Sequence, residues 1–152
     1  MVRLLDKERE LCLMEKLFDL MRENTPESVS QWEKENWLAE VIPALKKVPR
    51  QIALLYCKGV LAGFCMYYIN SEKLMVEELQ IRKEYRQTIL AVELYRFLKE
   101  ILPKDTLYVE AYADKDNRIS RNLMEKHGMR PVGVTPDGSC IHYKGKIDCI
   151  FR

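Results

Sequence analysis

The sequence has few of the residues that build metal sites, disulfide frameworks or membrane spans. Of its 152 residues only 2 are histidines, and the 5 cysteines are odd in number, widely spaced and without a Cys-x-x-Cys pair. This pattern argues against a zinc site or a disulfide framework and is typical of a reducing compartment. No apolar run approaches the roughly 20 residues that cross a bilayer, and the N-terminus becomes charged too early for a signal peptide. We therefore expect a cytoplasmic protein without a metal and without membrane attachment.

A large charge of one sign is also missing, since the net charge is only +2. Such a value does not indicate nucleic-acid binding, and we expect no nucleic-acid partner. The charge is nevertheless uneven. Residues 1–40 carry 10 acidic and 6 basic side chains, whereas residues 41–152 carry 13 acidic and 19 basic ones. An anionic ligand on the second part and a cationic one near the first would suit this asymmetry, although solvated helix faces produce similar counts.

The composition is that of a globular domain, with 47% apolar and 32% charged residues. The length fits one domain over residues 1–152 and is sufficient for a buried core. Hydrophobic periodicity predicts the element order β-α-α-β-β-β-α-β-α-β-β, a mixed sheet of the α/β class. We expect strands at 2–5, 51–57, 60–69, 74–82, 106–111, 129–134 and 140–151, and helices at 7–24, from about 30 to a kink or end at Pro43, at 87–102 and from 116 or 117 to 127.

One junction carries most of the functional information. The predicted strand ends at Glu77-Glu78-Leu79-Gln80-Ile81-Arg82, and the next helix begins near Gln87 after the basic turn Lys83-Glu84-Tyr85-Arg86. The start of a helix presents backbone N–H groups without intrahelical partners at the positive end of the helix dipole. The junction is therefore a ready site for a phosphate group.

The junction and a second motif together resemble the GNAT superfamily of acyl-CoA N-acyltransferases. The first part is Leu79-x-Ile81-x-x-x-Tyr85-Arg86 before a long helix. The second is Asn117 followed by Leu123-Met124-Glu125-Lys126-His127-Gly128-Met129 before a strand, similar to the family's Asn…Leu-Tyr-Glu-Lys-x-Gly-Phe pattern. The similarity extends from about Gln51 to Val134. It is weak in the N-terminal helices and the final hairpin, where such enzymes usually hold the acceptor.

The resemblance implies a fold, a cosubstrate and a set of binding residues. The fold is a central, mostly antiparallel mixed sheet with helices on both faces and one splayed parallel strand pair. Acetyl-CoA would place its pantetheine arm between the splayed strands, bonded to the backbone of Leu79 and Ile81 like an added strand. Its pyrophosphate would rest beside Arg86 on the N–H groups of the next five residues, and Asn117 would contact the arm or cap its helix. These five are Gln87, Thr88, Ile89, Leu90 and Ala91.

The sequence departs from the family pattern at two positions. The family's phosphate loop reads Arg/Gln-x-x-Gly-x-Gly/Ala, and Ile89 stands where the central glycine belongs. Glycine permits both close backbone approach and unusual φ values, which a β-branched residue restricts. Met124 occupies the position of a tyrosine that is commonly assigned to protonate the departing CoA thiolate, and methionine cannot donate a proton.

Acyl transfer to an amine needs a carboxylate, often working through water, that accepts the proton of the attacking amine. Strand alternation places Glu77 with Leu79 and Ile81, and Glu78 on the opposite face. Family analogy permits a base on either splayed strand, so Glu78 and Glu110 are the favoured candidates, unranked. Each is equally well explained as a strand carboxylate beside a cation. Tyr143, and after it Tyr112, are the candidates for the missing acid.

The sequence therefore predicts an N-acetyltransferase that moves the acetyl group from acetyl-CoA directly to a primary amine. The acidic N-terminal part favours a cationic acceptor such as a polyamine, an aminoglycoside or a lysine-like amine. Because Ile89 and Met124 depart from the family pattern, the alternative is a degenerate module that binds acyl-CoA as a sensor or interaction domain. An α/β protein with an accidental motif match is the third possibility. Many relatives dimerise, so a homodimer is compatible with the resemblance.

Overall fold

A computed structural model of the chain describes residues 1–25, 31–47 and 49–150. The described residues form one seven-stranded sheet in the order β1-β2-β3-β4-β5-β7-β6. The strands are β1 Val2–Leu4, β2 Gln51–Cys57, β3 Val60–Asn70, β4 Lys73–Ile81, β5 Tyr108–Asp114, β6 Arg130–Val134 and β7 Cys140–Lys146. The helices are α1 Leu13–Asn24, α2 Gln31–Lys47, α3 Ile89–Ile101, α4 Arg118–Lys126 and α5 Ile147–Ile150, with a 3-10 turn, η1, at Lys83–Tyr85.

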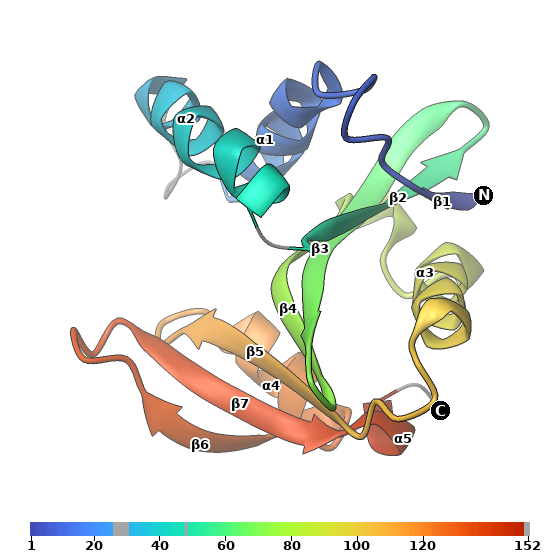
Figure 1. Ribbon diagram of the computed structural model, residues 1–152. Helices are drawn as coiled ribbons and strands as arrows, with labels where there is room; N and C mark the ends of the chain where they lie inside the picture. The colour runs from blue at the N-terminus through green and yellow to red at the C-terminus, as the bar shows by residue number, and fades with distance from the viewer. Residues whose placement is uncertain (26–30, 48, 151–152) are drawn as a thin grey trace.

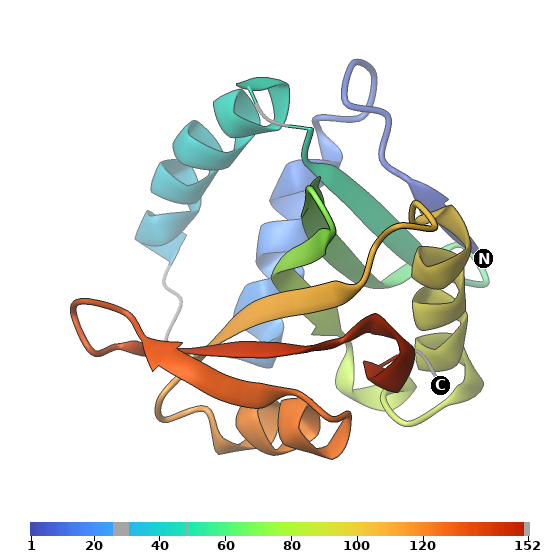
Figure 2. The same ribbon diagram turned by 60° about the horizontal axis from the view of Figure 1, so that its bottom comes forward.

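The sheet separates two layers of helices (Figure 1). α1 and α2 lie on one face of β2, β3 and β4, and α3 lies on the other, while α4 covers β5 and β7 (Figure 2). Each layer has its own core. Phe64 and Met66 face α1 and α2, whereas Cys65, Leu74 and Tyr143 belong to the cluster that includes α3. Every neighbouring strand pair is antiparallel except β4 and β5. The expected mixed α/β fold is confirmed.

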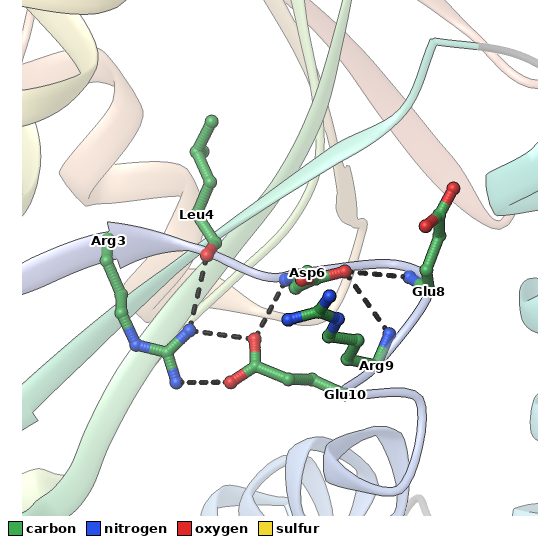
Figure 3. Close-up of polar contacts among 6 residues, drawn as sticks. All are labelled: Arg3, Leu4, Asp6, Glu8, Arg9 and Glu10. Carbon is green, nitrogen blue, oxygen red and sulfur yellow. Dashed lines mark hydrogen bonds and ion pairs between the residues drawn. The ribbon is translucent and has the colours of Figure 1, made fainter.

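The first helix begins later than its periodicity predicts, at Leu13 rather than near residue 7. Polar contacts hold the preceding segment in turns (Figure 3). The Asp6 carboxylate accepts the backbone N–H groups of Glu8 and Arg9, and Glu10 makes a two-point ion pair with Arg3 of β1 at 2.7 and 2.8 Å. A side chain that bonds its own local backbone competes with helix formation, so the helix begins only after this tie.

The remaining differences from the predicted elements lie at element ends. α2 continues through Pro43 to Lys47, so this proline does not end the helix. β5 runs over Tyr108–Asp114, and β7 ends at Lys146, where α5 replaces the expected continuation of the strand. The start of the second helix, expected at about residue 30, lies outside the described residues. None of the described helices is long and apolar enough to cross a membrane.

A β-bulge at Glu77 opens the sheet between β4 and β5. Met66 of β3 pairs with Glu78, but the next residue, Tyr67, pairs with Val76, so Glu77 is one residue too many. Beyond this point β4 and β5 no longer pair, because their parallel register covers only Lys73–Val76 and Tyr108–Ala111. Bulges bend the strand and can end its pairing on one side. The two strands therefore diverge toward their C-terminal ends (Figure 1).

Candidate active site

The C-terminal half of β4 has a free backbone edge. Arg82 N–H donates to the Ala62 carbonyl at 2.9 Å, and Gly63 stands opposite Ile81. In an antiparallel pair, residues alternate between bonding their partner strand and pointing away from it. The N–H and C=O groups of Ile81 and of Leu79 consequently point away from β3, toward the gap where β5 has diverged. This edge offers an extended ligand the hydrogen bonds of a missing strand.

The N-terminus of α3 lies directly after this edge. Thr88 caps the helix, because its Oγ1 accepts the Leu90 N–H at 3.3 Å and donates to the Tyr85 carbonyl at 2.6 Å. Gln87 has the left-handed φ of 58° that turns the chain into the helix. Ile89 is the first helical residue and is 71% exposed. The left-handed backbone is thus at Gln87, and Ile89 is not strained. Its side chain affects only how closely an anion approaches the first-turn amides of the helix.

Two arginines of the junction have different partners. Arg82 pairs with Glu23 of α1 and donates Nε to the Leu61 carbonyl at 2.8 Å, so it fastens α1 to the sheet. Arg86 is exposed and donates Nε to the Ile81 carbonyl at 2.9 Å. Its two terminal nitrogens have no hydrogen bond to the residues that the structure describes. Arg86 is therefore held next to the helix start with nitrogens available for an anion.

Glu78 lies on the face of β4 that is covered by α1, opposite Met66. Burial raises the pKa of its carboxyl group above the ordinary value of 4.5, and a hydrogen bond from Gln80 Nε2, at 2.6 Å, partly offsets the rise. A raised pKa brings a carboxylate closer to the range in which it can accept a proton from an amine and release it again. Among the predicted carboxylates, Glu78 thus combines a position beside the gap with the electrostatics of a base.

Replacing Glu78 with glutamine should raise the melting temperature at neutral pH. Since the folded protein holds the Glu78 proton more tightly than the unfolded chain, the free energy of unfolding falls as pH rises from the ordinary carboxyl pKa through the raised one. Glutamine removes this penalty, so we expect a gain of about 2 °C at pH 7 to 8 that shrinks to zero toward pH 4. Thermal melts across this range measure it. Glu77→Gln is the control, and an equal gain in both variants would contradict the explanation.

Glu110 lies at the closed end of the gap, where β4 and β5 still pair. Its side chain is only 8% exposed, and its carboxylate oxygens lie 3.3 Å from Lys73 Nζ, 3.4 Å from His142 Nε2 and 4.0 Å from Lys144 Nζ. Tyr112 stacks on His142 with ring centroids 4.6 Å apart. Glu110 is therefore compensated by cations of β4 and β7, and it is placed less favourably than Glu78 for contact with a ligand in the gap.

The predicted residues on the other side of the gap, Asn117 and Tyr143, lie at α4. Asn117 caps this helix, with Oδ1 accepting the Ser120 N–H at 3.1 Å. Tyr143 is completely buried, and its hydroxyl accepts from Arg121 Nε and donates to Glu125 Oε1, both at 3.3 Å. Met124 packs against the same cluster as Tyr143. A tyrosine thus lies beneath the helix on which the family pattern has one, although it comes from β7.

The structure reveals two polar residues that the sequence did not identify as functional. Asn24, the last residue of α1, donates Nδ2 to Gln80 Oε1 at 2.9 Å and to the Ile81 carbonyl at 3.1 Å. Gln80 in turn bonds Glu78. No local pattern marks a contact between residues 56 positions apart.

In the described part of the chain, no group of three or more His, Cys, Asp or Glu side chains could hold a metal ion.

Comparison with known proteins shows which family the sequence matches. The model of the acetyltransferase (GNAT) family matches residues 14–129, a stretch that contains β4, α3 and α4. A curated relative is a candidate ribosomal protein bS18-alanine N-acetyltransferase of Bacillus subtilis (strain 168). It is 26% identical over 106 residues, which cover 69% of this chain and 68% of the relative.

Solved structures of acetyltransferases share the fold over nearly the whole chain. The PaiA N-acetyltransferase of Thermoplasma acidophilum, in complex with coenzyme A, is 18% identical with a TM-score of 0.66, over 96% of this chain and 99% of that one. The aminoglycoside 6'-N-acetyltransferase of Enterococcus faecium is 16% identical with a TM-score of 0.63, over 97% of both chains. At these identities the likeness shows the fold.

Proposed function

The chain belongs to the acetyltransferase (GNAT) family, and we propose that this acetyl-CoA-dependent N-acetyltransferase moves the acetyl group directly to a primary amine of a cationic acceptor. The observation that carries the proposal is the free edge of Leu79 and Ile81 beside Glu78, with the helix start of α3 following. The primary amine is supported by two similar proteins, named for acetylation of an alanine and of an aminoglycoside 6' position. The cationic acceptor is supported by the acidic balance of residues 1–40.

The residues at the gap fit acetyl-CoA. An extended amide-bearing arm would bond the N–H and C=O of Leu79 and the N–H of Ile81. The Ile81 carbonyl is already taken by Asn24 and Arg86, so we do not assign it to the ligand. A pyrophosphate would lie at the first turn of α3, near the N–H groups of Gln87 to Ala91 and the terminal nitrogens of Arg86. Asn117 holds the start of α4 on the opposite wall and remains our candidate for a contact with the arm.

The chemistry requires one proton to leave the amine and one to reach the sulfur. In the proposed reaction the amine nitrogen bonds the thioester carbonyl carbon, the carbon–sulfur bond breaks, and Glu78 accepts the amine proton directly or through water. We assign the base to Glu78 in preference to Glu110, since cations surround the Glu110 carboxylate. Tyr143 remains our candidate for the proton donor to the thiolate, with Tyr112 as the alternative.

An acetyl-transfer assay tests the proposed function. The protein is incubated with acetyl-CoA and a panel containing spermidine, an aminoglycoside, a lysine amide and an alanine-terminated peptide, while the release of free thiol is followed. We expect release that depends on one class of cationic amine. If no amine of the panel causes thiol release although calorimetry shows tight CoA binding, the result would contradict catalysis. It would favour the sensor alternative suggested by Met124. Absence of CoA binding would overturn the assignment of the gap.

Replacing Arg86 with alanine should weaken CoA binding without affecting the fold. Loss of one charge-assisted contact to a phosphate predicts a roughly 5- to 10-fold higher Kd. The melting temperature without ligand should stay the same, because Asn24 still donates to the Ile81 carbonyl. Isothermal titration calorimetry measures the Kd. The control is Lys83→Ala, an exposed cation three residues away. Equal effects of both variants would indicate general charge attraction and contradict a specific role of Arg86.

A further inference from the structure

Three hydrogen bonds form a continuous chain from a backbone carbonyl to the proposed base. Asn24 Nδ2 donates to the Ile81 carbonyl at 3.1 Å and to Gln80 Oε1 at 2.9 Å, and Gln80 Nε2 donates to Glu78 Oε1 at 2.6 Å. Gln80 and Glu78 point to the same face of β4, two residues apart, while Asn24 reaches them from the end of α1. The chain therefore connects the helix on one side of the gap with the carboxylate beside it.

The Ile81 carbonyl determines the donor-to-acceptor direction of all three hydrogen bonds. An amide side chain can be turned over, which exchanges its donor and its acceptor, but a backbone carbonyl only accepts. Since Asn24 donates to this carbonyl, its NH₂ group faces Gln80 as well, and Gln80 must present its oxygen to Asn24. The NH₂ group of Gln80 is then directed at Glu78. The reversed orientation of Gln80 would place an oxygen against the carboxylate and cost the hydrogen bond.

These hydrogen bonds also reach the loop before α3, where we place the cofactor phosphate. The Ile81 carbonyl accepts a further hydrogen bond from Arg86 Nε at 2.9 Å. One oxygen at the end of β4 thus receives a donor from α1 and a donor from the loop before α3. A purely structural tie between α1 and β4 would already be provided by the ion pair of Glu23 with Arg82. The amide chain adds what this pair does not, a fixed donor at the Glu78 carboxylate.

We propose that Gln80 is a positioning residue for Glu78 and that Asn24 keeps Gln80 in its donating orientation. The inference rests on the proposed function, in which Glu78 accepts the amine proton. Gln80 holds one carboxylate oxygen, which fixes the side chain and leaves the second oxygen for the amine or for a water molecule. It also favours the ionised carboxylate and so opposes the effect of burial on its pKa.

The other titratable groups near Glu78 are compensated or neutral. The Cys65 thiol on β3 is buried, which raises its pKa to about 12 and keeps it protonated, and the Glu78 charge adds to this effect. Burial likewise raises the pKa of Tyr67 to about 12. Four ion pairs compensate charged side chains on the elements packed here, namely Arg50 with Glu77, Arg82 with Glu23, Lys34 with Asp19 and Lys73 with Glu110. Gln80 is thus the group whose removal changes the Glu78 carboxylate most directly.

The pH profile of kcat/KM tests the proposal. Gln80→Met keeps the length of the side chain and removes the donor, so the acid limb should move to higher pH. We expect a shift of roughly one pH unit, with kcat/KM returning to the wild-type value on the alkaline side of both limbs. Asn24→Leu should shift the limb in the same direction. The control is Thr25→Val at the end of the same helix, where Thr25 Oγ1 donates to the Met21 carbonyl at 2.8 Å and, among the described residues, takes no part in the Asn24–Gln80–Glu78 hydrogen bonds. Its profile should equal that of the wild type.

A double-mutant cycle separates positioning from a structural role. If Asn24 acts through Gln80, the double variant Asn24→Leu/Gln80→Met has the pH profile of Gln80→Met alone, whereas independent effects would add. An acid limb that stays in place in Gln80→Met would overturn the proposal, provided the melting temperature and the CoA Kd match the wild type. Glu78→Gln distinguishes failure of the proposed base from failure of the proposed positioning residue. If that variant keeps the wild-type profile, Glu78 is not the base; if it loses the acid limb while Gln80→Met keeps it, only the positioning role fails.

Discussion

Glu78→Gln should lower kcat/KM for acetyl transfer by about 10²- to 10⁴-fold, the range that a positioned general base contributes. The amide fills the same space and still accepts from Gln80, but it cannot take up the proton of the attacking amine. The affinity for CoA should change little, because the ligand edge consists of the backbone of Leu79 and Ile81. Initial-rate kinetics with the best acceptor of the panel, combined with calorimetry for CoA, measure both quantities.

The adjacent carboxylate provides the matched control for this loss. Glu77 precedes Glu78, but it occupies the bulge and pairs with Arg50. Glu77→Gln should therefore keep kcat/KM within about three-fold of the wild type. The Glu78 assignment would be wrong if Glu78→Gln retained more than a tenth of the activity, or if Glu110→Gln alone produced the larger loss with an unchanged melting temperature.

Gly63→Ala should be among the most destabilising single substitutions in the sheet. A Cβ atom at this position would lie 2.6 Å from the Gln80 carbonyl oxygen and 3.2 Å from Ile81 Cα, so backbone rather than a flexible side chain would have to move. Overpacking of this kind costs about 1 to 3 kcal/mol of the free energy of unfolding, or roughly 5 °C in melting temperature. Because β4 would be displaced at Ile81, the affinity for CoA should also fall.

Gly133 provides the corresponding control. A Cβ atom there would meet no other atom within 4 Å, and its φ is not in the left-handed range. Gly133→Ala should therefore leave the melting temperature and the Kd for CoA near the wild-type values. Thermal melts and calorimetry on both variants test the argument. A Gly63→Ala variant with wild-type stability would show that β3 and β4 accommodate a methyl group at this crossing.

Much of the fold was predictable because its signals are local. Hydrophobic periodicity predicted strands at 51–57, 60–69 and 74–82 and a helix at 87–102. The structure has these elements as β2, β3, β4 and α3, with ends that differ by at most two residues. The family resemblance also predicted the parallel pair of β4 and β5. These features depend on residues close together in the chain, which a single sequence displays directly.

The parts that sequence reasoning missed depend on side-chain contacts that no periodicity shows, or on one extra residue in a strand. α1 begins late because the Glu10 carboxylate pairs with Arg3 of β1 and holds the preceding segment in turns. Hydrophobic periodicity does not show such a pair. The link from Asn24 to Gln80 exists only once α1 packs against β4. Strict alternation also placed Glu77 on the face of Leu79, whereas the bulge removes it from the alternation. The roles of Glu78, Arg86, Asn117 and Tyr143 in catalysis and binding stay predictions.

The bulge at Glu77 means that the gap is created by the number of residues in β4 rather than by their chemistry. A β4 shorter by that one residue would alternate without interruption, and its edge could continue to pair with β5 where the two now diverge. The extra position needs no special side chain, so it leaves no compositional trace. When this chain is aligned with others, a one-residue gap near residue 77 is therefore more informative about the ligand cleft than a substitution at the same place.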